Sequence, residues 1–216
     1  MKIMEANMDY TALILAAGKK AAKGISYKKA FAEIDKGQSV IDKSVSVFLN
    51  DKRCKQVVIV TNSADLRKLV QAHDSGKIIH VQGGKTRAES VLLGLTAVSE
   101  EVVLIHDGVR PWIELKYIDK ILEKMETAKA CVLAIKPKGA LLHVEDGYVQ
   151  EIVKRNYMQT QTPQAYKTNF ILRCYTLAKS LELNVLDDAE LVSRVSDERI
   201  AVVEGDIRNT RFILKD

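Results

Sequence analysis

Cysteine and long apolar runs are both scarce in this sequence, and each scarcity excludes a class of protein. The only cysteines are Cys54, Cys131 and Cys174, which lie far apart and form no C-x-x-C pair. This spacing predicts neither a zinc site nor a disulfide framework, and it favours reduced thiols in packed positions. No run approaches the roughly 18 apolar residues that a membrane span needs, and residues 1–9 lack the apolar region of a signal peptide. We therefore expect a cytoplasmic protein with no membrane partner.

The net charge of the protein is modest, and its distribution does not indicate a nucleic-acid partner. The formal net charge is +5, without an arginine-rich tail or a basic stripe interleaved with aromatic residues. This balance fits an anionic small-molecule substrate. A hydrophobic content of 47% is enough for a sizeable core, and 216 residues suit one α/β domain.

Strand and helix patterns alternate along most of the chain. The alternation predicts a mostly parallel sheet with right-handed crossovers. Strands are expected at residues 11–17, 56–60, 78–81, 102–105, 131–135 and 200–203, and helices at 65–72, 89–98, 115–128, 168–181 and 189–192.

One segment breaks this alternation and reads as a β-hairpin. Leu141–Val153 contains two apolar stretches around the turn Asp146–Gly147. A two-stranded ribbon is marginal in water. We therefore expect residues 139–155 to form an arm that projects from the sheet and packs on another subunit.

The loop after the first predicted strand favours a nucleoside triphosphate. Small residues at Ala16, Ala17 and Gly18 would let a ligand lie against the backbone, whose N–H groups can cradle phosphate. Five lysines follow within eleven residues: Lys19, Lys20, Lys23, Lys28 and Lys29. Open α/β sheets bind ligands at this edge. The alternative is a plain strand followed by a solvated basic helix start, since no Walker motif is present.

A second loop, which begins at Gly83, joins a strand to a helix. Arg87 and Ser90 lie one helical turn apart, so both could meet a base or phosphate above this turn. A structural interpretation is also open, in which Thr86 is the N-cap and Glu89 completes a capping box.

Polar residues follow the strand at 102–105. Asp107 could hold Mg²⁺ together with substrate phosphates, and Arg110 could clamp a second phosphate. These two residues could instead form a simple loop salt bridge. Residues 159–164, fixed by Pro163, are suited to hydrogen-bonding a polyol.

Together these motifs resemble the 2-C-methyl-D-erythritol 4-phosphate cytidylyltransferase family over about residues 10–214. The related ribitol-5-phosphate cytidylyltransferases share much of the set and remain an alternative. The matching motifs are Ala16-Ala17-Gly18, Gly83-Gly84-x-x-Arg87-x-x-Ser90-Val91, His106-Asp107-x-x-Arg110-Pro111, Gln161-Thr162-Pro163-Gln164, Asp187-Asp188-Ala189 and Gly205-Asp206-x-x-Asn209. The first and fifth favour the methylerythritol branch.

The resemblance implies one Rossmann-like nucleotidyltransferase domain over residues 1–216, with helices on both faces of the sheet. It implies an enzyme of isoprenoid biosynthesis that joins CTP to a polyol phosphate with Mg²⁺, releases pyrophosphate, and forms a homodimer through the arm. The roles carried over are catalytic for Lys29, Arg211 and Lys23, nucleotide-binding for Ala16, Ala17, Gly18, Gly83, Arg87 and Ser90, substrate-binding for Arg110, Lys154, Arg155 and Thr162, and metal-binding for Asp107.

Several positions depart from the family pattern. Ala22 stands where the family has an arginine, residues 139–142 replace a polar Asp-Thr-x-Lys stretch, and Arg211 replaces a lysine. Lys20 or Lys23 could substitute for the missing arginine as point charges. A catalytically impaired, nucleotide-binding paralogue is therefore the alternative to an active enzyme.

Overall fold

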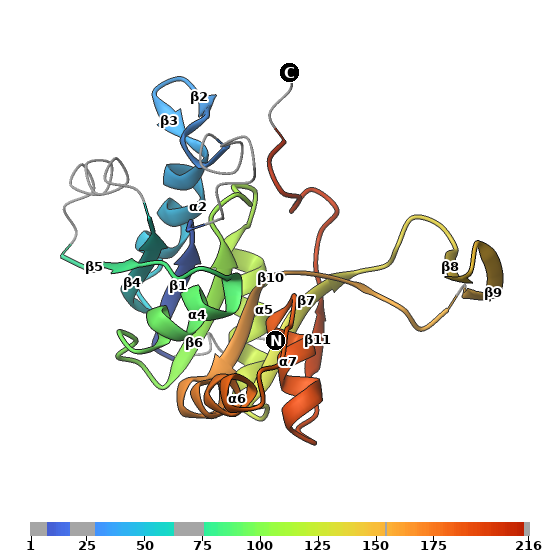
Figure 1. Cartoon of the computed structure of the whole chain (residues 1–216). Coiled ribbons are helices and arrows are strands. Elements are labelled where there is room, and N and C mark those ends of the chain that lie inside the picture. The colour runs from blue at the N-terminus through green and yellow to red at the C-terminus, as the bar shows by residue number, and fades with distance from the viewer. Residues whose placement is uncertain (1–7, 18–28, 63–75, 154, 214–216) are drawn as a thin grey trace, which may run out of the picture.

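A seven-stranded mixed sheet forms the centre of the molecule (Figure 1). The computed structural model describes residues 8–17, 29–62, 76–153 and 155–213. Within them the strands lie in the order β11 (Ala201–Glu204), β7 (Ala130–Ile135), β10 (Gln159–Lys167), β6 (Val102–Asp107), β1 (Tyr10–Leu15), β4 (Cys54–Thr61) and β5 (Ile78–Gln82). All neighbouring pairs are parallel except those that β10 makes with β6 and β7. The predicted mostly parallel α/β sheet is confirmed.

Helices cover both faces of the sheet because successive side chains of its central strands point to opposite sides. Ala12 and Ile14 of β1 belong to one core, and Leu13 belongs to the other. The first core is closed by α2 (Val40–Leu49) and α5 (Leu115–Met125), and the second by α4 (Arg87–Leu95), α6 (Thr168–Ser180) and α7 (Asp188–Val195). Near-continuous apolar runs in β4 and β6 satisfy both faces at once.

Three elements differ from the sequence-based expectation. The polar stretch 159–164, to which no strand was assigned, is the first part of β10, the antiparallel strand between β6 and β7. Helix α2 and the small β2–β3 ribbon (Glu33–Asp35 and Gln38–Ser39) were not predicted. The helix expected at 65–72 lies outside the described residues.

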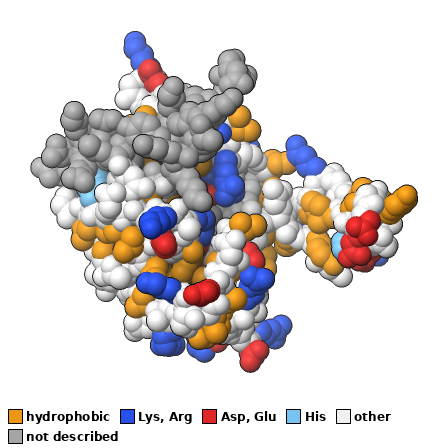
Figure 2. Space-filling model, viewed as in Figure 1, with side chains coloured by type: hydrophobic (Ala, Val, Ile, Leu, Met, Phe, Trp, Pro, Cys, Tyr) orange, Lys and Arg blue, Asp and Glu red, His pale blue; other side chains and the backbone are white. Residues whose placement is uncertain are grey.

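The hairpin of β8 (Leu141–Glu145) and β9 (Tyr148–Val153) projects from the body, as predicted (Figures 1 and 2). Asp146 and Gly147 have φ angles of 51° and 81°, the positive values that a tight two-residue turn requires. Six large apolar side chains on this arm are exposed: Leu141, Leu142, Val144, Tyr148, Val149 and Ile152. None of the described helices has the length and apolar character needed to cross a bilayer.

Candidate active site

The loop that follows β6 is fixed at the edge of the sheet where the parallel strands β1 and β6 end. The Gly108 amide donates to the Leu15 carbonyl at 3.0 Å, and the Ser44 hydroxyl donates to the Gly108 carbonyl at 2.9 Å. A Cβ atom at Gly108 would lie 2.5 Å from Cδ1 of Ile41 and 3.2 Å from the Leu15 carbonyl oxygen, so a larger residue here would force the Ile41 side chain to move. These contacts hold Asp107 and Arg110 at the carboxyl edge of the sheet, where open α/β folds bind ligands.

Asp107 is a buried carboxylate surrounded by arginines. Its Oδ2 atom accepts from Arg211 Nε at 3.0 Å and lies 3.3 Å from Arg110 Nε. Burial alone would raise the pKa of Asp107, but Arg211, Arg87 and Arg110 outweigh it and hold this pKa below its usual value. The carboxylate is therefore ionised at neutral pH. The predicted Asp107–Arg110 ion pair forms, and Arg211 joins it.

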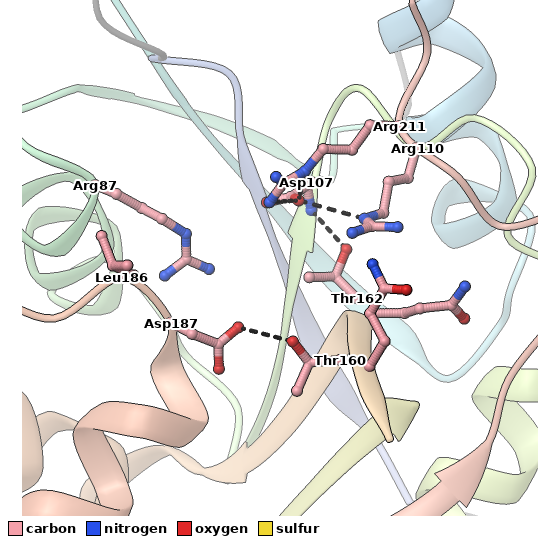
Figure 3. Close-up of a pocket in the computed structure, with 10 residues that line it drawn as sticks. Arg87, Asp107, Arg110, Thr160, Thr162, Leu186, Asp187 and Arg211 are labelled. Atoms are coloured by element: carbon pink, nitrogen blue, oxygen red, sulfur yellow. Dashed lines mark hydrogen bonds and ion pairs between the residues drawn. The ribbon is translucent and has the colours of Figure 1, made fainter. Parts of the chain in front are cut away.

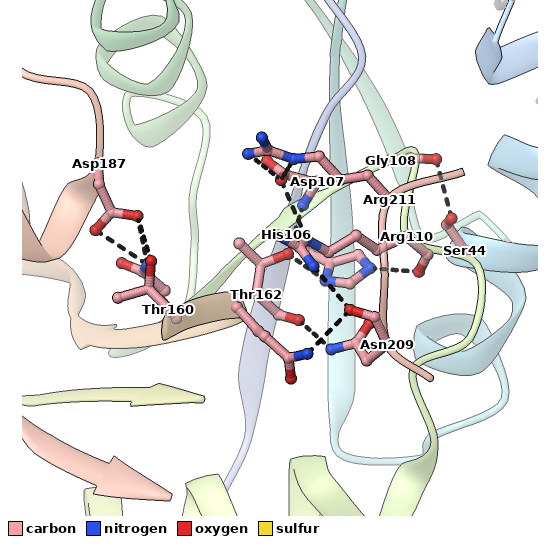
Figure 4. A network of polar contacts seen from close by, with 12 residues as sticks. Ser44, His106, Asp107, Gly108, Arg110, Thr160, Thr162, Asp187, Asn209 and Arg211 are labelled. Atoms are coloured by element: carbon pink, nitrogen blue, oxygen red, sulfur yellow. Dashed lines mark hydrogen bonds and ion pairs between the residues drawn. The ribbon is translucent and has the colours of Figure 1, made fainter. Parts of the chain in front are cut away.

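His106 and Thr162 connect β6 to β10 beneath this carboxylate (Figure 4). The Asp107 amide donates to Thr162 Oγ1 at 3.0 Å, and that hydroxyl lies 3.1 Å from His106 Nδ1. On the other side of the ring, Nε2 lies 3.1 Å from the Arg110 carbonyl, which can only accept. These contacts assign a neutral imidazole that is protonated at Nε2 and accepts the Thr162 hydroxyl at Nδ1.

The C-terminal segment closes one side of the site. Asn209 Nδ2 donates to the Thr162 carbonyl at 2.8 Å, and Arg110 Nη1 donates to the Asn209 carbonyl at 2.7 Å. The Phe212 amide donates to the Val109 carbonyl at 2.7 Å. Arg211, between these anchors, is thereby brought to Asp107 although its side chain is 64% exposed.

A cavity of about 190 Å³ opens between this cluster and the start of α7 (Figure 3). Arg87 and Asp187 line it opposite Asp107, and Thr160 lies within 3.5 Å of Asp187. The complete lining is Arg87, Asp107, Arg110, Gln159, Thr160, Gln161, Thr162, Leu186, Asp187 and Arg211. Three arginines, Arg87, Arg110 and Arg211, line the cavity, and guanidinium groups suit a phosphorylated ligand.

The Gly83 loop packs against the end of β1. A Cβ atom at Gly83 would lie 2.2 Å from Cβ of Ala17, which brings the two small-residue stretches of the sequence side by side. The Gly83 amide donates to the Thr61 carbonyl at 3.3 Å. The backbone here can therefore approach a ligand closely.

Only part of the predicted capping of α4, the helix that follows this loop, is present. Thr86 caps α4 by accepting from the Glu89 amide, but the Glu89 carboxylate accepts from the Lys85 amide, so the expected capping box is wrong. The Ser90 hydroxyl donates to the Thr86 carbonyl at 2.9 Å and is buried. Arg87 turns instead towards α7, so Arg87 and Ser90 share no partner among the described residues. Their predicted contacts with a nucleotide stay a prediction.

The structure brings together five of the predicted site residues, which all line the cavity: Arg87, Asp107, Arg110, Thr162 and Arg211. Ala16, Ala17, Gly83 and Ser90 lie at the ends of β1 and β5 and at the start of α4. Lys29 is half-buried and Arg155 is exposed, and neither lines this cavity. Gly18, Lys23 and Lys154 fall outside the described residues.

Sequence reasoning missed Leu186 as a lining residue and named Asp187 only as part of the Asp187-Asp188-Ala189 motif. Asp187 caps α7, accepting from the Ala189 amide at 2.8 Å, and it also accepts from Gln164 Nε2 at 2.9 Å. The doubled acid at a helix start is a signal that could have pointed to both roles.

Comparison with known proteins places this geometry in a family. The family model for 2-C-methyl-D-erythritol 4-phosphate cytidylyltransferase matches residues 10–215. The cytidylyltransferases of that name from Bacillus licheniformis and Bacillus mycoides are 32% and 34% identical, over 97% and 94% of this chain and 92% and 91% of theirs. A crystal structure of 4-diphosphocytidyl-2C-methyl-D-erythritol synthase from Anaerococcus prevotii superposes with a TM-score of 0.85 at 28% identity, covering 95% of this chain and 93% of that one.

The fold, with its arginine-lined pocket at the carboxyl ends of the parallel strands, is that of a nucleotidyltransferase. The chain belongs to the 2-C-methyl-D-erythritol 4-phosphate cytidylyltransferase family.

Proposed function

We propose that this protein transfers the cytidylyl group of CTP to 2-C-methyl-D-erythritol 4-phosphate, giving the CDP-polyol and pyrophosphate. The observation that supports this most is the family match over residues 10–215. It coincides with a pocket in which Asp107 is surrounded by Arg87, Arg110 and Arg211.

This reaction requires the protein to neutralise the charge of two phosphorylated substrates and to position them. The phosphate of the polyol attacks the α-phosphorus of CTP, the α–β phosphoanhydride bond breaks, and pyrophosphate leaves. Because phosphate is already a competent nucleophile, the protein needs to align two anions and offset their repulsion. We propose that Arg110 and Arg211, at the carboxyl edge of the sheet, do so, and that Lys29 neutralises the α-phosphate. Lys23 is proposed to add charge on the triphosphate side.

Two groups of residues at the site are proposed to bind the two substrates separately. The Ala16–Ala17 and Gly83 backbone, together with Ser90 and Gly18, is proposed to receive the nucleotide. Arg110 and Thr162 line the cavity proposed for the polyol phosphate. Lys154 or Arg155, which follow β9 in the sequence, is proposed to contribute to a neighbouring subunit.

The residues at the end of β6 fit a magnesium ion. Mg²⁺ is held by one or two carboxylates together with substrate phosphates and water. Both arginine contacts of Asp107 fall on Oδ2, and within the described chain Oδ1 accepts no hydrogen bond. We propose that Asp107 Oδ1 holds Mg²⁺ and that the ion, when bound, neutralises triphosphate charge.

The arm supports a homodimer. Its six exposed apolar side chains lie on both faces of a ribbon that two strands cannot bury alone. A second copy of this chain would cover them. The three cysteines are unpaired and buried, which suits the reducing cytoplasm that we expect for this enzyme.

Pyrophosphate release tests the proposal. The wild-type chain, CTP and Mg²⁺ are assayed with 2-C-methyl-D-erythritol 4-phosphate, ribitol 5-phosphate and erythritol 4-phosphate in parallel. Release with the first alone supports the proposal, and release with ribitol 5-phosphate alone would reassign the substrate. No release with any acceptor, while CTP still binds in calorimetry, would favour an inactive paralogue.

A further inference from the structure

Asp188, the first residue of α7, is a fully buried carboxylate held by two other helices. It accepts from Arg87 Nη1 at 2.8 Å and Nη2 at 2.5 Å, in the two-pronged geometry typical of arginine and carboxylate. The Tyr175 hydroxyl of α6 also donates to it. The Asp188 side chain is 0% exposed, whereas that of Arg87 is 28% exposed and lines the cavity.

A second network of the same composition lies at the opposite edge of the sheet. There Asp51 accepts from the Tyr10 hydroxyl at 2.9 Å and from Arg53 Nη2 at 2.7 Å. Tyr10 is the first residue of β1, so this network is far from the carboxyl ends that carry the pocket. Arg53 Nε also donates to Asp51, at 2.9 Å, and Nη2 donates to Asp119 at 2.6 Å as well, so these donors do not face a cavity. The molecule therefore contains a structural counterpart of the Asp188 network.

Arg87 is poorly placed for a purely structural cation. It is the first residue of α4, where the positive end of the helix dipole disfavours a guanidinium. Its Nε–H donates to no other described residue, and its charge still lowers the pKa of Asp107 across the cavity. Arg87 thus lines the pocket (Figure 3) while Asp188 binds its Nη1 and Nη2 atoms.

We propose that Asp188 is a positioning residue that fixes the Arg87 guanidinium at the cavity wall, where it meets a phosphoryl oxygen of the bound substrates. The inference rests on the proposed function. Without the Asp188 carboxylate, Arg87 has two other acids within its own cavity, Asp107 and Asp187. Pairing with either would draw the guanidinium into the space that a ligand must occupy.

Isosteric removal of one carboxylate from each network tests this. Asp188→Asn and Asp51→Asn each take the charge from between a tyrosine and an arginine, so both should lower the melting temperature. Only Asp188→Asn should lower kcat/KM for CTP, on the order of tenfold to 100-fold, because a misplaced contact group slows the chemical step. Equal kcat/KM in Asp188→Asn and wild type would overturn the proposal.

A double variant tests whether Asp188 acts through Arg87. If it does, Arg87→Gln with Asp188→Asn should lose no more activity than Arg87→Gln alone, because no misdirected guanidinium remains. Additive losses would overturn the proposal. Should Asp188→Asn fail to fold, Arg87→Lys keeps the charge but loses the fork that fits Asp188. It should lower kcat/KM, and wild-type values in it would contradict the inference.

The outcome is separable from that of the proposed function. A wild-type chain that neither releases pyrophosphate nor binds CTP in calorimetry with Mg²⁺ overturns the proposed function. A wild-type chain that turns over, with Asp188→Asn indistinguishable from it, overturns this inference alone.

Discussion

The Thr162 hydroxyl donates to Nδ1 of His106 at 3.1 Å and joins the antiparallel strand β10 to the end of β6. The same hydroxyl accepts the Asp107 amide, so it fixes the metal-binding candidate and the imidazole together. Burial lowers the pKa of His106 from 6.5 to about 4, and the network requires the neutral ring.

The protein should lose stability as the pH falls from 6.5 to about 4. In that window the unfolded chain binds a proton at this histidine that the folded chain does not, so acid favours unfolding. The loss in the free energy of unfolding from this group is about 3 kcal/mol. Denaturant unfolding of wild type and His106→Asn between pH 7 and pH 4 measures it. The variant should show a shallower pH dependence than wild type. Parallel curves for His106→Asn and wild type would contradict this assignment.

Replacement of the Asp107 carboxylate should weaken the Mg²⁺-dependent binding of CTP without disturbing the fold. Asp107→Asn keeps the size of the side chain but removes the charge that would hold Mg²⁺. We expect CTP affinity with Mg²⁺ to fall about tenfold or more, with little change in circular dichroism. Asp35→Asn, an exposed acid paired with Lys43, is the matched control and should bind CTP normally. Unchanged CTP affinity in Asp107→Asn would exclude Asp107 as the metal ligand.

Charged substitutions on the arm should cause the expected dimer to dissociate. Leu142 and Ile152 are opposite each other in the β8–β9 ribbon and are 54% and 56% exposed. Placing Asp at both positions puts two charges into a surface that we expect to be covered, so light scattering at micromolar concentration should give a monomer instead of a dimer. Leu181→Asp changes an equally exposed leucine on the body and should leave the dimer intact. A monomeric wild type would refute the role of the arm.

The lysines near the first loop are predicted to replace the family's missing arginine. Lys29→Ala should lower kcat on the order of 100-fold or more, because it removes a cation at the α-phosphorus. Lys36→Ala, which changes an exposed lysine in the turn between β2 and β3, is the control. Ala22→Arg restores a planar fork and should tighten CTP binding or raise turnover. Wild-type turnover in Lys29→Ala would show that the charge comes from elsewhere.

The parallel part of the fold could be predicted because its signals are local. β4 and β6 are short apolar runs bounded by polar residues, and β8–β9 carries its Asp146–Gly147 turn in the sequence. Helix α2 was missed although it has a capping box between Ser39 and Asp42, a pattern visible in the sequence.

Strand β10 could not be read in this way because its polar residues depend on distant partners. Gln164 is fully buried and donates to Asp187, and Thr162 reaches His106. Pro163 within the run also argues against a strand. The pairing of Arg211 with Asp107 joins residues 104 positions apart, so the resemblance could suggest both residues but not their contact. The partnership of Arg87 with Asp188 is likewise a product of the fold.

Phosphorus NMR of the reaction mixture tests the central claim most directly. Wild-type protein, CTP, Mg²⁺ and 2-C-methyl-D-erythritol 4-phosphate are combined, and the spectrum is followed with time. The account predicts that the three triphosphate signals of CTP disappear while pyrophosphate and two coupled diphosphate signals of the CDP-polyol appear in equal amounts. Unchanged CTP and phosphomonoester signals at stoichiometric protein concentration would contradict it.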